Sequence, residues 1–265
     1  MNSSASATQV REYAPVSAWR WLASLSILGN IGLNYWANAH PFNGQTMGAV
    51  SAKYPTMLTP AGYAFSIWGV IFLALTVYAV WQLLPAQRAT SLPGTLARPL
   101  TLASVATASW VVLFAYELIE LSVLAMLVLL GSLILTYGRA RKQTLAHKVP
   151  RWVSIPFALY LGWISVATVL NVTIGLRELG WQTETNIAVL LTLLLLAVVV
   201  GLALVVSKVF RELVFPAVVV WALVAIWVAQ RGAYPELGWA ALVGAGVVAV
   251  GGTWLGLRRS RRRTR

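Results

Sequence analysis

The chain contains no cysteine and no aspartate, and only two of its 265 residues are histidine. Without cysteine there are no disulfides, thiolate metal sites, cysteine nucleophiles or redox pairs. Two histidines do not make a multi-histidine metal centre, and all the acidic side chains are seven glutamates. The sequence also lacks GxSxG, HExxH and phosphate-loop motifs. We therefore expect no catalytic residues and no metal site.

Charge of either sign is scarce. Only 10% of the residues are charged, 59% are hydrophobic and the mean hydropathy is +0.75, which excludes an ordinary water-soluble enzyme. A helix needs about 20 apolar residues to cross a bilayer. Eight stretches of that kind occur, at 18–38, 60–83, 97–116, 118–138, 152–175, 186–207, 213–230 and 237–257. The sequence predicts an all-α membrane protein, a bundle of about eight transmembrane helices.

The basic residues indicate the orientation of this bundle. The net charge is +13, and Lys and Arg are retained in short cytoplasmic loops. With the N-terminus inside, only Lys53, Arg177 and Arg231 lie outside. The inside residues are Arg11, Arg20, Arg88, Arg98, Arg139, Arg141, Lys142, Lys148, Arg151, Lys208, Arg211, Arg258, Arg259, Arg261, Arg262, Arg263 and Arg265. We therefore expect a multi-pass protein of the cytoplasmic (inner) membrane with both termini cytoplasmic. The basic tail could bind membrane lipid, and no nucleic-acid partner is expected.

The first span allows two interpretations. Its basic flank and the triplet Ala37-Asn38-Ala39 imitate a cleavable signal peptide. However, Asn30 and Asn34 interrupt the apolar core, which favours a retained helix. These two asparagines share one helix face with Asn38. They could line a ligand cavity or join helices through hydrogen bonds, and Asn171 in the fifth span has the same two interpretations.

Thirteen tryptophans are the most unusual feature of the composition. Eight lie near span ends, where indole rings anchor helices at the membrane interface: Trp19, Trp21, Trp36, Trp81, Trp152, Trp181, Trp239 and Trp254. Five lie deeper: Trp68, Trp110, Trp163, Trp221 and Trp227. Because a lipid-facing indole N–H finds no partner at that depth, we expect these five inside the bundle. They could fill the core or form a pocket for a flat apolar ligand.

The loop at 39–59 is the longest on the outer side, and its Pro and Asn-Gly residues indicate an ordered segment that could cap the outer mouth of the bundle. Glu117 and Glu120 follow the third span, and we expect both side chains to be solvated.

Three segments carry the motifs of one known family. They are TPAGYAFSIWGVIFLAL (59–75), ASVATASWVVLFAYE (103–117) and IPFALYLGWISVATVLNVTI (155–174). Their order, spacing and Trp-centred patterns resemble the TspO/MBR family, the translocator proteins also called tryptophan-rich sensory proteins. The run WISVATVLN is the most specific match.

The resemblance implies a five-helix bundle that binds tetrapyrroles, sterols or other apolar ligands in a cavity closed by the loop between the first two helices. It implies ligand contacts in the second, third and fifth spans. With the deep Trp110 and the first-span asparagines, the candidate ligand-binding residues are Trp68, Trp110, Phe114, Trp163, Ala167, Leu170, Asn171, Asn30 and Asn34.

The resemblance also divides the chain. We expect a cytoplasmic N-terminal segment at 1–17, a TspO/MBR-like bundle at 18–175, a three-helix membrane extension at 176–257 and a basic cytoplasmic tail at 258–265. The extension could cover the surface through which short family members pair, which leaves a homodimer open, or it could form a partner-binding or gating unit. Its low polarity favours packing against the bundle.

The leading hypothesis is a membrane protein that binds a flat lipophilic small molecule, a tetrapyrrole or similar, in a Trp-lined cavity for sensing, handling or translocation. It requires no cofactor. One alternative is a permease for a small apolar or amphipathic solute. Another is an enzyme that modifies a bound pigment, which only the family analogy supports.

Overall fold

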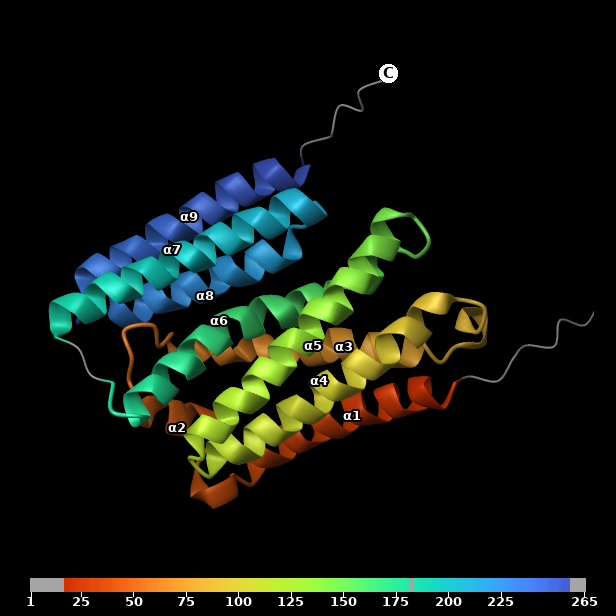
Figure 1. Ribbon diagram of the computed structural model, residues 1–265, viewed down its shortest axis with the longest axis horizontal. Helices are drawn as coiled ribbons and strands as arrows, with labels where there is room; N and C mark the ends of the chain where they lie inside the picture. The colour runs from red at the N-terminus through yellow and green to blue at the C-terminus, as the bar shows by residue number, and fades with distance from the viewer. Residues whose placement is uncertain (1–16, 182–183, 258–265) are drawn as a thin grey trace, which may run out of the picture.

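The computed structural model describes residues 17–181 and 184–257, and this part of the chain is a set of long helices joined by short turns (Figure 1). The helices are α1 (Ala18–Ala39), α2 (Met47–Lys53), α3 (Ile67–Trp81), α4 (Ser91–Ala115), α5 (Ile119–Leu145), α6 (Ile155–Glu178), α7 (Thr185–Phe210), α8 (Val214–Gln230) and α9 (Pro235–Leu257). All eight predicted spans are helical, so the predicted all-α membrane bundle is confirmed. The basic tail and nearly all of the N-terminal segment lie outside the described residues.

Length and composition suit these helices to a bilayer. Within the described part of the chain, six helical segments are long and apolar enough to cross a membrane: Gly62–Trp81, Ser91–Ala115, Ile119–Leu145, Arg151–Glu178, Thr185–Phe210 and Pro235–Leu257. The apolar helix α8 is shorter, with 17 residues. The hydrocarbon core of a membrane contains no water that could bond to backbone N–H and C=O groups. Apolar segments there form helices, because a helix satisfies these hydrogen bonds internally. α1 begins and α9 ends at the same end of the bundle (Figure 1).

Five helices form a closed ring. α1 packs against α3 and α4, α3 packs against α6, and α5 joins α6 to α4. α7, α8 and α9 form a separate three-helix layer, which meets the ring mainly where α8 packs on α6 (Figure 1). The most apolar stretch of α6 is 61% buried, against 28% for α7 and α9. α6 is therefore the shared central helix, and α7 and α9 are largely exposed.

α4 begins at Ser91, six residues before the predicted span, although it contains Pro99. A proline inside a helix leaves the carbonyl four residues earlier without its N–H partner. Here Arg139 of α5 donates from Nη1 to the Thr95 carbonyl at 2.8 Å. A charged side chain from the neighbouring helix thus replaces the lost backbone bond, and α4 continues through the proline.

Small residues allow close helix packing, both between the ring and the extension and within the extension. A Cβ atom on Gly162 of α6 would lie 3.0 Å from Cβ of Val218 in α8. Similar close contacts would arise in α9 at Gly244, against Val200, and at Gly252, against Ser207. Helices in lipid associate through such close packing, because lipid tails provide little hydrophobic drive between them.

Polar anchors fix the extension at both ends. At the α2 end of the bundle, Gln230 of α8 donates to the Thr56 and Thr59 carbonyls at 3.3 and 3.2 Å. At the opposite end, Arg141 of α5 donates to the carbonyls of Phe210 and Arg211 and lies 3.7 Å from the Glu212 carboxylate. The contacts of Arg141 attach the α7–α8 turn to the ring.

Candidate ligand-binding site

A small cavity of about 50 Å³ lies beneath α2, between helices of the ring and of the extension. Its walls come from the α2–α3 region, α4, α5, α6 and the extension. They consist of Ser51, Leu58, Pro60, Phe65, Trp68, Trp110, Phe114, Met126, Trp163, Ile164, Val166, Ala167, Val169, Leu170, Asn171, Ile174, Leu196, Val199, Leu223 and Ile226. Seven of the nine residues predicted from the sequence are among them, so residues about 100 positions apart in the chain meet around one space.

Asn30 and Asn34 are the two candidates that do not line this cavity. Asn34 Nδ2 donates to the Asn30 carbonyl at 2.9 Å and to its Oδ1 at 3.0 Å, within α1. Asn30 is buried. The structure therefore pairs the two amides along one helix and does not bring them to the other seven residues.

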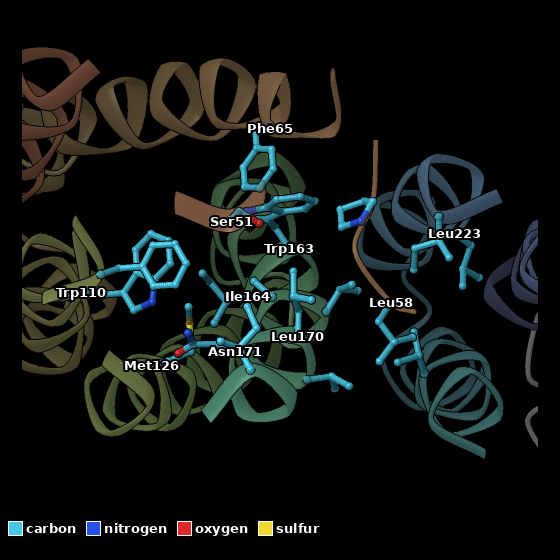
Figure 2. A pocket seen from close by; sticks show the side chains of 18 of the residues that line it. Ser51, Leu58, Phe65, Trp110, Met126, Trp163, Ile164, Leu170, Asn171 and Leu223 are labelled. Atoms are coloured by element: carbon cyan, nitrogen blue, oxygen red, sulfur yellow. The ribbon is translucent and has the colours of Figure 1, made fainter. Parts of the chain in front are cut away.

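Aromatic rings form two faces of the cavity. Phe65 packs edge-on against Trp163, with centroids 5.8 Å apart, while Trp110 and Phe114 stack at 5.0 Å. Figure 2 shows Phe65 and Trp163 together, Trp110 to one side, and Leu58 with Leu223 on the opposite side. A flat apolar molecule between these faces would gain stacking and dispersion contacts.

Asn171 and the indole N–H of Trp110 border this apolar space, in addition to Ser51. Asn171 is buried, and its Nδ2 donates to Ser122 Oγ of α5 at 3.2 Å. Ser122 Oγ donates to the Ile119 carbonyl at 2.7 Å, and its contact with Asn171 Oδ1 is longer at 3.4 Å. The Nε1–H of Trp110 is buried without a hydrogen-bond partner among the described residues. A buried donor without a partner is costly, so a ligand acceptor at this position would be stabilising.

A polar contact also joins two helices across the ring. Thr107 of α4 is buried and hydrogen-bonds to the hydroxyl of Tyr160 in α6.

Trp221 was expected in the interior, but it is 37% exposed on α8, and that prediction is wrong. Its indole Nε1 still finds a partner, since it donates to the Ala64 carbonyl at 3.1 Å.

The 39–59 loop covers the cavity, as the sequence suggested. Val50 and Ser51 of α2 are buried, and Ser51 lines the cavity. Val50 packs with Phe114 and Ile174, near the C-terminal ends of α4 and α6, and with Ile119 at the start of α5. The apolar face of α2 therefore forms a lid on the ring.

Glu117 fastens this lid; we expected it to be solvated, and its side chain is 26% exposed but also has three partners in the loop. It occupies the α4–α5 turn with a φ of 57°, a left-handed conformation that costs energy for a non-glycine residue. Its carboxylate accepts from Lys53 Nζ at 2.7 Å, Tyr54 Oη at 2.8 Å and Gln45 Nε2 at 3.1 Å. The bonds from Lys53 and Tyr54 hold the pKa of Glu117 below its usual value. Burial and the bond to Glu117 raise the pKa of Tyr54 to about 12.

Several wall residues were not singled out from the sequence. Phe65 lies one turn before Trp68, and an aromatic pair at that spacing is a usable signal for a shared wall. The extension contributes Leu196, Val199, Leu223 and Ile226. Nothing in the sequence distinguishes these from the many other aliphatic residues of α7 and α8, because their role depends on how the two layers dock.

Comparison with known proteins gives a family but no close relative. The family model described as TSPO-like protein matches residues 20–254. No curated protein and no solved structure matches the chain. The family match extends from α1 into α9, so it includes the three-helix layer as well as the ring. The chain belongs to the TSPO-like family and is a multi-pass membrane protein.

Proposed function

We propose that the cavity beneath α2 binds a flat lipophilic molecule, with a tetrapyrrole as the leading candidate, for sensing, handling or translocation. The observation that carries this proposal is the convergence of Trp68, Trp110, Trp163 and Asn171 on one space that also contains a buried donor without a partner. Aromatic walls with a few polar groups are the usual composition of small-molecule sites.

The polar groups would orient the ligand. Trp110 Nε1 would donate to a ligand acceptor. Asn171 Oδ1 would accept from a ligand N–H, because the shorter bond of Ser122 goes to the Ile119 carbonyl. A molecule with a flat apolar body and both kinds of polar group suits this arrangement.

Binding requires the cavity to widen. Ligand pockets usually measure about 300–1,000 Å³, and a cavity of about 150 Å³ accommodates benzene. At about 50 Å³ the cavity is smaller than either. We infer that the described conformation is closed. Displacement of α2 would open the outer side, since its polar attachment depends on Glu117 at the surface.

We further propose the inner membrane as the location, with both termini in the cytoplasm. The support is the distribution of charge along the sequence: the Lys and Arg residues fall overwhelmingly in the segments at one end of the predicted spans, and Lys53, Arg177 and Arg231 in those at the other end.

The test is equilibrium titration of the purified protein in nanodiscs with protoporphyrin IX, followed by tryptophan fluorescence. Trp163→Ala removes a cavity wall and should raise Kd about tenfold or more, the size expected when an aromatic contact of about 1.5 kcal/mol is lost. The matched control is Trp239→Ala, because Trp239 is 60% exposed on α9. Equal Kd values for these two variants would contradict the proposed site.

A second variant avoids the risk that Trp163→Ala perturbs the fold. Trp110→Phe keeps a ring in the wall and removes only the N–H. A hydrogen bond in a membrane interior contributes about 0.6–1.7 kcal/mol, so Kd should rise about 3- to 15-fold. An unchanged Kd would show that Trp110 does not donate to the ligand.

The small volume of the cavity favours one alternative, a permease for a solute of a few heavy atoms. Its test is solute flux in proteoliposomes. Flux without porphyrin binding would favour the permease, and porphyrin binding without flux would favour the binding protein.

A further inference from the structure

A second hollow lies beside the cavity, and it is far larger. It is a groove of about 1,510 Å³ between α5, α6 and α7. At the outer end it reaches Arg177 and Trp181, and towards the inner end it reaches Tyr137 and Phe210. The groove exists because α7 packs mainly on α8 and α9 and touches α6 only slightly.

The side of this groove faces the surroundings of the helices. Ile134 of α5, Leu194 of α7 and Val198 of α7 line it and are 54%, 55% and 64% exposed. In a bilayer, exposed apolar side chains at this position contact lipid tails. The groove is therefore continuous with the hydrocarbon of the membrane.

The groove and the cavity share a wall that is one side chain thick. Pro60 and Val169 line both spaces. On α7 the neighbouring residues Leu195 and Leu196 line the groove and the cavity respectively. Movement of these few side chains would join the two spaces.

The outer side of the cavity is better closed. There α2 buries Val50 and Ser51 and is held by three hydrogen bonds to Glu117. A lipophilic molecule also concentrates in the membrane and not in water, because transfer of its apolar surface into hydrocarbon is favourable. The thin apolar wall at Val169 and Pro60 is thus the less obstructed path for such a molecule.

We infer that the α5–α6–α7 groove is the entrance through which the lipophilic ligand passes from the membrane to the cavity. The inference rests on the proposed function and adds the route. It also assigns a task to the extension: α7 forms the far wall of the entrance, and α7 and α8 close the cavity behind it.

The test is the rate of binding in phosphatidylcholine vesicles, measured by stopped-flow quenching of tryptophan fluorescence by protoporphyrin IX. Val172→Phe with Leu195→Phe narrows the groove and leaves the cavity walls intact. A narrowed entrance should slow association and dissociation alike by about tenfold. Kd should stay within about threefold, because the groove residues do not contact the ligand once it is bound in the cavity. The matched control is Leu190→Phe with Val205→Phe, two positions on α7 that are both 57% exposed outside the groove.

Three results would overturn the inference. Unchanged rate constants in the groove variant would exclude the groove as the route, while binding by the unmodified protein would leave the proposed function standing. If the groove variant loses co-purifying phospholipid while its association and dissociation rate constants for protoporphyrin IX are unchanged, the groove is a binding site for lipid and not the entrance. No quenching in the unmodified protein would remove the proposed function, and the route with it.

Discussion

The ring and the three-helix extension are built on different principles. In the ring, polar side chains join helices to one another: Thr107 pairs with Tyr160, and Asn171 pairs with Ser122. In α7 and α9, Ser207 and Thr253 bond to carbonyls of their own helix. Thr192 does the same and also contacts Met57 Sδ at 3.8 Å. The close packing of α9 depends on glycines, as at Gly244.

This difference separates the two roles. Directional bonds between buried groups hold aromatic walls in position, which a binding site needs. Glycine contacts hold helices together without shaping a site. Polar bonds between the layers run to the ring from Trp221, Thr192, Gln230, the Ala225 carbonyl and the α7–α8 turn. Under the proposed function, the ring would supply the polar groups that orient the ligand, and the extension would support and close the cavity.

The largest expected effect comes from breaking the contacts of Arg141 with the α7–α8 turn. Arg141→Met leaves Glu212 buried without its cation and should lower the free energy of unfolding by about 3–5 kcal/mol. Arg141→Met with Glu212→Leu should recover much of this loss. The measurement is unfolding in detergent, with Lys142→Met, an exposed position on the same helix, as the control. If Arg141→Met is as stable as Lys142→Met, the contacts of Arg141 do not stabilise the fold.

A smaller loss is expected from filling the α6–α8 contact. Gly162→Leu forces side-chain atoms against Val218 and the Phe215 carbonyl, and such overpacking costs about 1–3 kcal/mol. Gly131→Leu on the exposed face of α5 meets no atom within 4 Å of its Cβ and is the control. Gly162→Leu should unfold at a lower temperature than Gly131→Leu. Equal unfolding midpoints would show that α8 can pack on α6 at a wider spacing.

Removal of one directional bond in the ring should cost less still. Ser122→Ala deletes the partner of Asn171 and should lower the free energy of unfolding by about 0.6 kcal/mol, and at most about 1.7. Ser26→Ala is the control, since Ser26 bonds only within its own helix turn. A loss above that range would mean that Ser122 has a role beyond this pair.

The smallest effect is confined to the lid and depends on pH. The pKa of Glu117 is lowered in the folded protein, so its stabilisation of the lid is present above the unfolded pKa and is lost as the pH falls through the folded value. The native chain has no cysteine, so Ala52→Cys places a spin label at one position in α2. The label should become more mobile as the pH falls from about 7 to about 3.

Glu117→Gln is the reference for this pH experiment. It should give a mobile label at both pH values, since the amide does not titrate in this range. A label whose mobility depends equally on pH in both proteins would assign the effect to another group.

Particular residues show what the sequence could predict. The apolar runs predict every long helix, and the Trp-centred segments identify Trp68, Trp163 and Asn171, which do meet at the cavity. The early start of α4 depends on Arg139, forty residues after Pro99, and no local pattern indicates such a bond. Likewise, Glu117 looks like any surface carboxylate until the outer loop folds onto it. What escaped prediction depends on contacts between distant segments.

The most direct test of the central claim is the affinity of Ala167→Leu for protoporphyrin IX. The added carbons occupy the cavity and leave every tryptophan in place, so the fluorescence signal is retained. Ala249→Leu on the exposed face of α9 is the matched control. If the cavity is the binding site, Kd should rise about tenfold or more in Ala167→Leu and stay unchanged in the control. Equal affinities in Ala167→Leu and the unmodified protein, with the fold intact, would contradict the account.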